Sequence, residues 1–137
     1  MIEKEFIPYE LALELKQLGF DEHCLSYYDK EEKLCRSLLE YPIVNSKNGF
    51  HHSHNIITAP LYQQAFRFFR EKHGLYPDIY RNGSGGKFSA NIENIVTGNS
   101  LKTVTEERID YEKAELACLK QLIEIVKTYG GNKWHEW

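Results

Sequence analysis

The fold is decided by residues 78–96, which read DIYRNGSGGKFSANIENIV. In the run 87–96 apolar residues alternate with polar ones, which is typical of an antiparallel strand with one buried face. The run 78–81 predicts its partner strand, and the glycine-rich residues 82–86 between them predict a flexible hairpin loop. We therefore predict an antiparallel hairpin, followed by a short third strand over residues 101–105.

Apolar residues at helical spacing predict two helices before this hairpin. The first spans residues 8–18 and ends at Gly19, a residue that suits the left-handed position after a helix. The second begins with Thr58 as its N-cap and Pro60 in its first turn. It ends at Gly74, in the same way as the first.

A third helix is predicted after the hairpin, from the capping residue Asp110 to about Lys127. Its apolar face is broad, so more than one side of the helix must be covered. The tail, residues 131–137, contains two tryptophans. It either frays into disorder or docks its indole rings on the body of the protein.

Residues 24–28 and 34–39 predict a second hairpin around a polar turn. A lone two-stranded hairpin is marginal in water, so we expect it to join the same sheet as the later strands. Helices and antiparallel strands are segregated along the chain in the order α-ββ-α-ββ(β)-α. The sequence therefore predicts one α+β domain over residues 1–137, with three helices packed on a small antiparallel sheet.

The composition excludes several classes of protein. The chain has 137 residues, of which 42% are hydrophobic, so it is not wholly disordered and can bury a core. Its 17 Lys and Arg against 20 Asp and Glu give a net charge of -3, which excludes a strongly basic nucleic-acid protein. No apolar stretch approaches the roughly 18 residues that span a bilayer, so we expect no membrane association.

The N-terminus and the cysteines indicate a compartment. The first residues lack the basic and then apolar pattern of a secretory signal. The three cysteines are an odd number, which argues against a disulfide framework. We therefore expect a cytoplasmic protein.

Three segments occur in a recognisable order: FIPYELA at 6–12, APLYQQAFRFFREK at 59–72 and YEKAELACL at 111–119. Together they resemble a group of short uncharacterised proteins of Bacteroides-type bacteria and their phages. The resemblance spans most of the chain. It implies a phage or mobile-element accessory protein, and it implies no activity and no catalytic residue, because no function is assigned to the group.

Three histidines in one polar loop form a candidate metal site: His51, His52 and His54. A zinc site needs three or four ligands, and the upstream His23, Cys24 and Cys35 give no spacing of a known zinc finger. A solvated loop is the favoured interpretation. A metal-dependent enzyme that uses the His51–His54 loop is the less favoured one, because no second acidic or histidine cluster completes the site.

The middle of the chain is its most basic part. Residues 41–100 contain six Lys and Arg against three Asp and Glu. The candidate nucleic-acid residues of the region 67–87 are Arg67, Arg70, Arg81 and Lys87. With neighbouring aromatic residues they could track a phosphate backbone and stack bases. The competing interpretation is that these side chains only solvate a helix and a hairpin, and the acidic balance of the chain favours it.

Two apparent catalytic motifs fail on their spacing. Residues 83–87, GSGGK, lack the first glycine of a phosphate loop and lead into a strand, not a helix. His23 and Cys24 are adjacent in a predicted strand, so they point to opposite faces and do not form a nucleophile–base pair.

The sequence leaves three functions open. We favour a non-enzymatic binding or adaptor module that acts through a protein partner or as a homodimer, with no cofactor. Nucleic-acid binding by the 67–87 region and a metal-dependent enzyme at the histidine loop are the alternatives.

Overall fold

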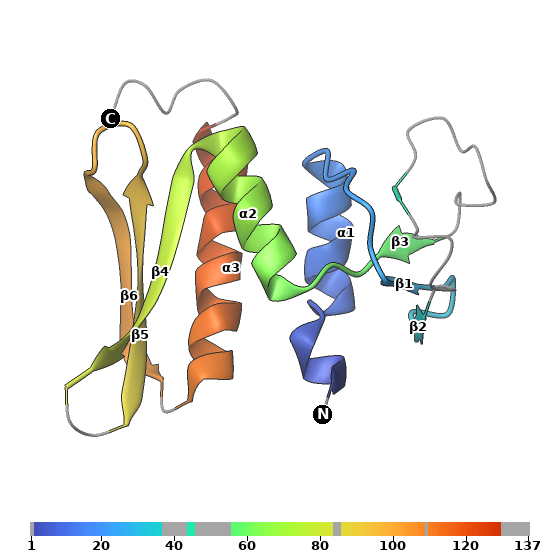
Figure 1. The fold of residues 1–137 in the computed structure, drawn as a ribbon, viewed down its shortest axis with the longest axis horizontal. Helices are drawn as coiled ribbons and strands as arrows, with labels where there is room; N and C mark the ends of the chain where they lie inside the picture. The colour runs from blue at the N-terminus through green and yellow to red at the C-terminus, as the bar shows by residue number, and fades with distance from the viewer. Residues whose placement is uncertain (1, 37–43, 46–55, 84–85, 109, 130–137) are drawn as a thin grey trace. The chain divides into compact units, whose positions relative to one another are not determined.

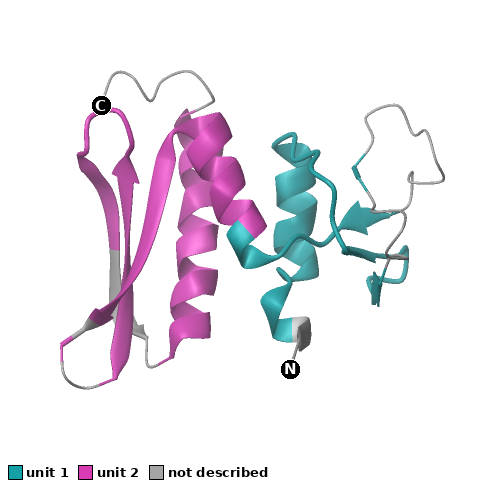
Figure 2. Ribbon diagram, viewed as in Figure 1, with its two compact units in different colours: residues 1–63 teal, residues 64–137 magenta. Residues whose placement is uncertain are grey.

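The computed structural model describes residues 2–36, 44–45, 56–83, 86–108 and 110–129 (Figure 1). The chain divides into two compact units, residues 1–63 and 64–137 (Figure 2). Over these described residues the class is α+β, with three α-helices and antiparallel strands in the predicted order. That residues 1–137 fold as a single domain stays a prediction, and the tail 131–137 lies outside the described residues.

The described part of the first unit holds a short 3-10 helix, one α-helix and three short strands. They are η1 (Ile2–Glu5), α1 (Tyr9–Gln17), β1 (Ser26–Tyr28), β2 (Leu34–Arg36) and β3 (Ile57–Thr58). The strands form an antiparallel sheet in the order β2-β1-β3, and α1 lies against β3.

The prediction that the 24–39 hairpin joins the sheet of the later strands is wrong. It does not join the sheet of the later strands, because β1 takes β3 as its second partner and the three strands form a sheet of their own. The hairpin does take a third strand as a partner, as expected from the marginal stability of a lone hairpin in water. The partner is a distant two-residue segment, with Tyr27 opposite Thr58 and Tyr28 opposite Ile57.

The end of α1 confirms the role of Gly19. Its φ of 93° lies in the left-handed region, which glycine adopts without strain. The N–H of Gly19 donates to the carbonyl of Lys16 at 3.0 Å, and the N–H of Phe20 donates to that of Leu15 at 2.9 Å. These two bonds form a Schellman motif, which ends the helix close to the predicted residue.

Where the structure describes it, the second unit contains two helices and a three-stranded antiparallel sheet. They are α2 (Tyr62–His73), whose first two residues belong to the first unit, β4 (Leu75–Asn82), β5 (Lys87–Asn94), β6 (Ser100–Arg108) and α3 (Tyr111–Tyr129). The strand order is β4-β5-β6, and α3 lies along one face of all three strands (Figure 1). The hairpin predicted from residues 78–96 is therefore confirmed, and the third strand is longer than predicted.

The predicted start of the second helix is wrong. Thr58 pairs with Tyr27 in the first sheet and does not cap α2, which begins only at Tyr62. The carbonyl of Pro60 accepts a 3.0 Å hydrogen bond from the N–H of Ile7, which holds the chain extended up to the helix. Tertiary pairing has here overridden a local capping signal.

The predicted cap of the last helix is confirmed. Asp110 Oδ1 accepts a 2.8 Å hydrogen bond from the N–H of Lys113, the third residue of α3. The helix continues to Tyr129, two residues beyond the prediction. Within the described ranges, no helix combines the length and apolarity that crossing a membrane requires.

Candidate functional site

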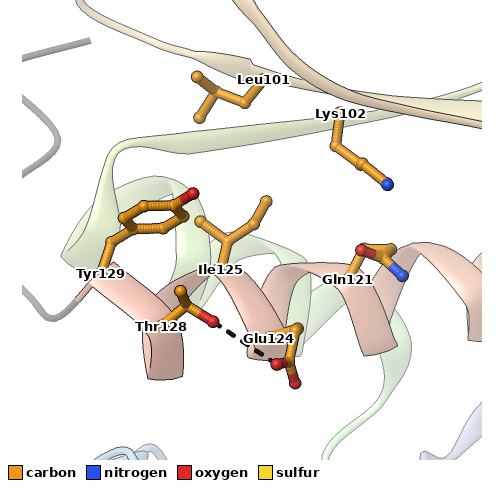
Figure 3. Close-up of a pocket in the computed structure, with 7 residues that line it drawn as sticks. All are labelled: Leu101, Lys102, Gln121, Glu124, Ile125, Thr128 and Tyr129. Carbon is orange, nitrogen blue, oxygen red and sulfur yellow. Dashed lines mark hydrogen bonds between the residues drawn. The ribbon is translucent and has the colours of Figure 1, made fainter.

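A groove lies between the beginning of β6 and the last turns of α3 (Figure 3). Its volume is about 220 Å³. Three apolar side chains and four polar ones line it: Leu101, Ile125 and Tyr129, with Lys102, Gln121, Glu124 and Thr128. We call it the β6–α3 groove.

The helical wall of the groove follows from the spacing of its residues. Positions 121, 125 and 128 are three or four residues apart on α3, so they share one side of the helix. Ile125 is only 8% exposed and forms the floor, whereas Tyr129 at the rim is 42% exposed. Thr128 Oγ1 donates to Glu124 Oε1 at 3.5 Å, which holds these two polar groups beside each other (Figure 3).

The strand wall of the groove is shaped by an irregularity in β6. Lys102 lies opposite Ile92 and Ser100 lies opposite Glu93, so Leu101 is an extra residue in the β5–β6 ladder. Such a bulge re-aims a side chain locally. Figure 3 shows Leu101 over the groove, across from Ile125.

The outer edge of β6 is open along the groove. In the part of the chain that the structure describes, β6 pairs with β5 and with no strand on its other side. An open edge presents main-chain N–H and C=O groups to any extended chain that approaches it. The groove therefore combines main-chain hydrogen-bonding groups, an apolar floor and charged side chains of both signs.

The four predicted nucleic-acid residues do not gather into one patch. Arg67 and Arg70 are three residues apart on α2, and Arg67 is exposed. Arg81 lies opposite Phe88, and Lys87 lies opposite Asn82. Paired residues share a face and neighbours alternate, so Arg81 and Lys87 point to opposite faces of the hairpin.

The sheet face away from α3 carries two exposed tyrosines. The ring of Phe88 meets that of Tyr111 at 5.5 Å, which identifies its face as the helix side. By alternation along the strand, Tyr76 and Tyr80 lie on the other face, where they are 47% and 37% exposed. We call this surface the tyrosine face; Asp78, also exposed, lies between the two rings on the same strand.

Asn91 organises the polar side chains of the tyrosine face. Its Oδ1 accepts hydrogen bonds from Ser100 Oγ at 2.6 Å and from Thr103 Oγ1 at 3.1 Å. Its Nδ2 donates to Glu93 Oε1 at 3.1 Å. This face therefore mixes aromatic rings with hydrogen-bonding and acidic groups and is not strongly basic.

The three cysteines are protonated thiols at neutral pH. Burial raises the pKa of Cys24 and of Cys118 to about 12. Burial and the neighbouring Asp29 carboxylate also raise the pKa of Cys35. A catalytic cysteine needs a lowered pKa, so none of the three has the electrostatics of a nucleophile.

The predicted metal site lies outside the described residues, since these do not include His51, His52 and His54. Among the residues that the structure does describe, no three His, Cys, Asp or Glu side chains are grouped so as to hold a metal ion. The metal site at the histidine loop stays a prediction.

Sequence reasoning missed the β6–α3 groove. Helical spacing places Ile125 on the broad apolar face predicted for the last helix, and the side chain is indeed buried. Nothing in the local pattern shows that a bulge at Leu101 opens space beside it, because the bulge exists only in the pairing of β5 with β6. The usable signal was the small polar stripe of Gln121, Glu124 and Thr128 beside that apolar face.

Comparisons with protein-family models, with curated proteins and with solved structures found no match for this chain. What the chain binds is therefore inferred from the chemistry of its own surfaces.

Proposed function

We propose that this chain is a non-enzymatic binding module that takes an extended segment of a protein partner along the open edge of β6. A side chain of that segment is seated in the β6–α3 groove. The observation that carries the proposal is the coincidence of an open strand edge with an adjacent groove that has an apolar floor.

The physical argument is that of strand addition. Main-chain hydrogen bonds to an edge strand supply affinity for any extended segment, and a pocket for alternate side chains supplies specificity. Here Leu101 and Ile125 offer apolar contact to one side chain. Lys102 and Glu124 lie in the same groove and can distinguish a segment by its charges.

The proposal is tested by selection from a displayed library of unbiased peptides against the full chain. We expect selected peptides to bind the Thr128→Arg variant at least tenfold more weakly, because the long cationic side chain enters the groove. Thr97→Arg is the matched control: it makes the same exchange at an exposed turn residue that does not line the groove. The proposal fails if no peptide is selected or if Thr128→Arg leaves the affinity unchanged.

A second candidate function is binding of single-stranded nucleic acid, favoured by one observation. Tyr76 and Tyr80 are exposed on one face of β4, where bases could stack on them, and Lys87 belongs to the same face. The acidic Asp78 between the rings opposes a phosphate backbone, which is why we rank this function second. It requires binding that weakens with salt and with the exchange Lys87→Ala, which removes the basic residue of this face.

Three further predictions from the sequence are neither supported nor opposed by these surfaces. They are the metal-dependent chemistry at His51, His52 and His54, the cytoplasmic location, and the role as a phage or mobile-element accessory protein.

A further inference from the structure

We infer that the tyrosine face binds an arginine side chain of a partner protein at the end where Tyr76, Asp78 and Glu93 lie together. We call these three residues the Tyr76 cluster. The cluster lies on the face of the sheet away from α3, whereas the β6–α3 groove lies on the helix side. The inference therefore concerns a second binding surface and does not rest on the proposed function.

The ladder between β4 and β5 brings the cluster together. It is unbroken over all eight residues of β4, and it sets Tyr76 directly opposite Glu93. Side chains directly opposite on one face have Cβ atoms about 5 Å apart, and diagonal neighbours such as Asp78 and Glu93 lie about 7–8 Å apart. Asp78 follows Tyr76 two residues along the strand, about 7 Å away. The ring of Tyr76 therefore has one carboxylate beside it along its own strand and another across the ladder.

The cluster is open to a ligand, and its charge is not balanced from within the described chain. Tyr76 is 47% exposed, Asp78 is also exposed and Glu93 is half-buried. Among the residues that the structure describes, no lysine or arginine forms an ion pair with either carboxylate. Lys87 belongs to the same face, but its ladder partner lies four residues beyond Asp78, about 14 Å along the strand. The charge complement that this end of the face lacks is a cation.

Asn91 holds one carboxylate in place and leaves the other open. Its Nδ2 donates to Glu93 Oε1, and its Oδ1 accepts from the hydroxyls of Ser100 and Thr103. Although Asn91 lies directly opposite Asp78, none of these bonds goes to it, and within the described residues the Asp78 carboxylate accepts no hydrogen bond. A ligand thus meets one preoriented carboxylate and one that is free to accept, which reduces the ordering cost of binding.

Arginine is the cation that fits this arrangement. Its guanidinium is planar, stacks on aromatic faces and donates to a carboxylate through two parallel N–H groups, whereas the lysine ammonium is a strongly hydrated point charge. A guanidinium stacked on the ring of Tyr76 directs its N–H groups outward in its own plane, where carboxylates beside the ring can accept them. A phosphate backbone at the same place meets the like charges of Asp78 and Glu93. The charges therefore favour an arginine of a protein partner over a nucleic acid.

The test is an NMR titration of the isotope-labelled full chain with the peptide acetyl-Gly-Ser-Arg-Ser-Gly-amide. We expect amide shifts centred on the Tyr76 cluster, and weaker binding of the same peptide with lysine in place of arginine. Asp78→Asn, and Tyr76→Leu, which removes only the aromatic face, should each weaken binding about threefold. Asp21→Asn removes the same charge from an exposed residue of the first unit and should leave the affinity unchanged. Tyr80→Leu, the matched exchange beside Asp78 but away from Glu93, should have the smaller effect.

Three results overturn the inference. The first is the absence of shifts at the Tyr76 cluster, and the second is equal affinity for the arginine and lysine peptides. The third is a loss with Tyr80→Leu as large as that with Tyr76→Leu, because the acidic end would then not be the binding end. A thymidine oligonucleotide that shifts the cluster where the peptide does not would assign the face to nucleic acid and overturn the inference as well.

The same titration separates this inference from the proposed function. Peptide shifts confined to Leu101, Ile125 and their neighbours would place the peptide in the β6–α3 groove, which overturns the inference and leaves the proposed function standing. Binding that Asp78→Asn weakens and Thr128→Arg leaves unchanged supports the inference, whatever the peptide selection yields.

Discussion

The hydroxyl of Tyr28 donates a buried 2.7 Å hydrogen bond to the main-chain carbonyl of Ile7, 21 residues earlier in the chain. The ring of the same tyrosine meets the ring of Tyr9 edge-on, with 5.5 Å between the centroids. One side chain of β1 thus ties the small sheet to the segment that leads into α1. Because the sheet is short, such side-chain links matter more than its ladder of main-chain bonds.

We expect Tyr28→Phe to lower the free energy of unfolding by about 1–3 kcal/mol, because it leaves the buried carbonyl of Ile7 without its donor. Urea denaturation followed by circular dichroism measures the change. Tyr9→Phe is the control: it keeps the ring that meets Tyr28 and should cost less than about 0.5 kcal/mol. Equal effects of the two exchanges would show that the bond to Ile7 contributes nothing of its own.

Gly19 is expected to resist substitution because of its backbone, not because of crowding. Its φ is 93°, and a Cβ placed there would meet no atom within 4 Å. Gly19→Ala should therefore destabilise by roughly 1–2 kcal/mol through left-handed strain alone. Gly19→Asn should cost less, since asparagine adopts this conformation more readily. The melting temperatures of the two variants, compared with that of the wild type, measure these costs. If Gly19→Ala leaves the melting temperature unchanged, the Schellman ending of α1 is contradicted.

The ends of α1 and α3 were predictable because their signals are local. Gly19 and Asp110 act through main-chain groups within five residues of themselves, so the sequence around each is sufficient. Thr58 carried an equally good local signal, yet its pairing with Tyr27 prevailed. Contacts between distant segments decide such cases, and a single sequence does not display them.

The same distinction separates the parts of the candidate site. That Ile125 faces inward follows from helical periodicity alone. That Leu101 lies across from it depends on a bulge in the β5–β6 ladder, which no local pattern announces. The opposite faces of Arg81 and Lys87 follow from the hairpin register, which in turn depends on how many residues the turn takes up.

Thiol reactivity should follow burial. Cys24 and Cys118 are buried and have a pKa raised to about 12, whereas the side chain of Cys35 is partly exposed. In the folded protein at neutral pH we expect iodoacetamide to modify Cys35 slowly and the other two cysteines not at all. Intact-mass spectrometry counts the adducts. Three adducts should form in urea, and Cys35→Ser should abolish the native-state adduct; modification of Cys118 in the folded protein would contradict its burial.

Stability should fall in mildly acidic solution because of His73. This histidine ends α2, where its ring lies 5.2 Å from that of Phe68 and 5.7 Å from that of Phe69. Burial lowers its pKa below the ordinary value of 6.5, although a helix C-terminus by itself favours the charged form. The unfolded chain therefore binds this proton at a higher pH than the folded chain does, and the contribution of His73 is complete only above pH 6.5.

As the pH falls below 6.5 and through the lowered pKa of the folded state, this contribution is lost progressively. The free energy of unfolding, measured in urea at several values between pH 8 and pH 5, should decrease with acid in the wild type. His73→Phe removes the titrating group and should flatten that part of the profile. Asp29 also has a lowered pKa, but its contribution to stability changes only at pH values near and below its ordinary pKa of 3.8. It therefore does not account for a loss of stability between pH 8 and pH 5. A wild type and a His73→Phe variant with parallel profiles between pH 8 and pH 5 would show that His73 is not the group responsible.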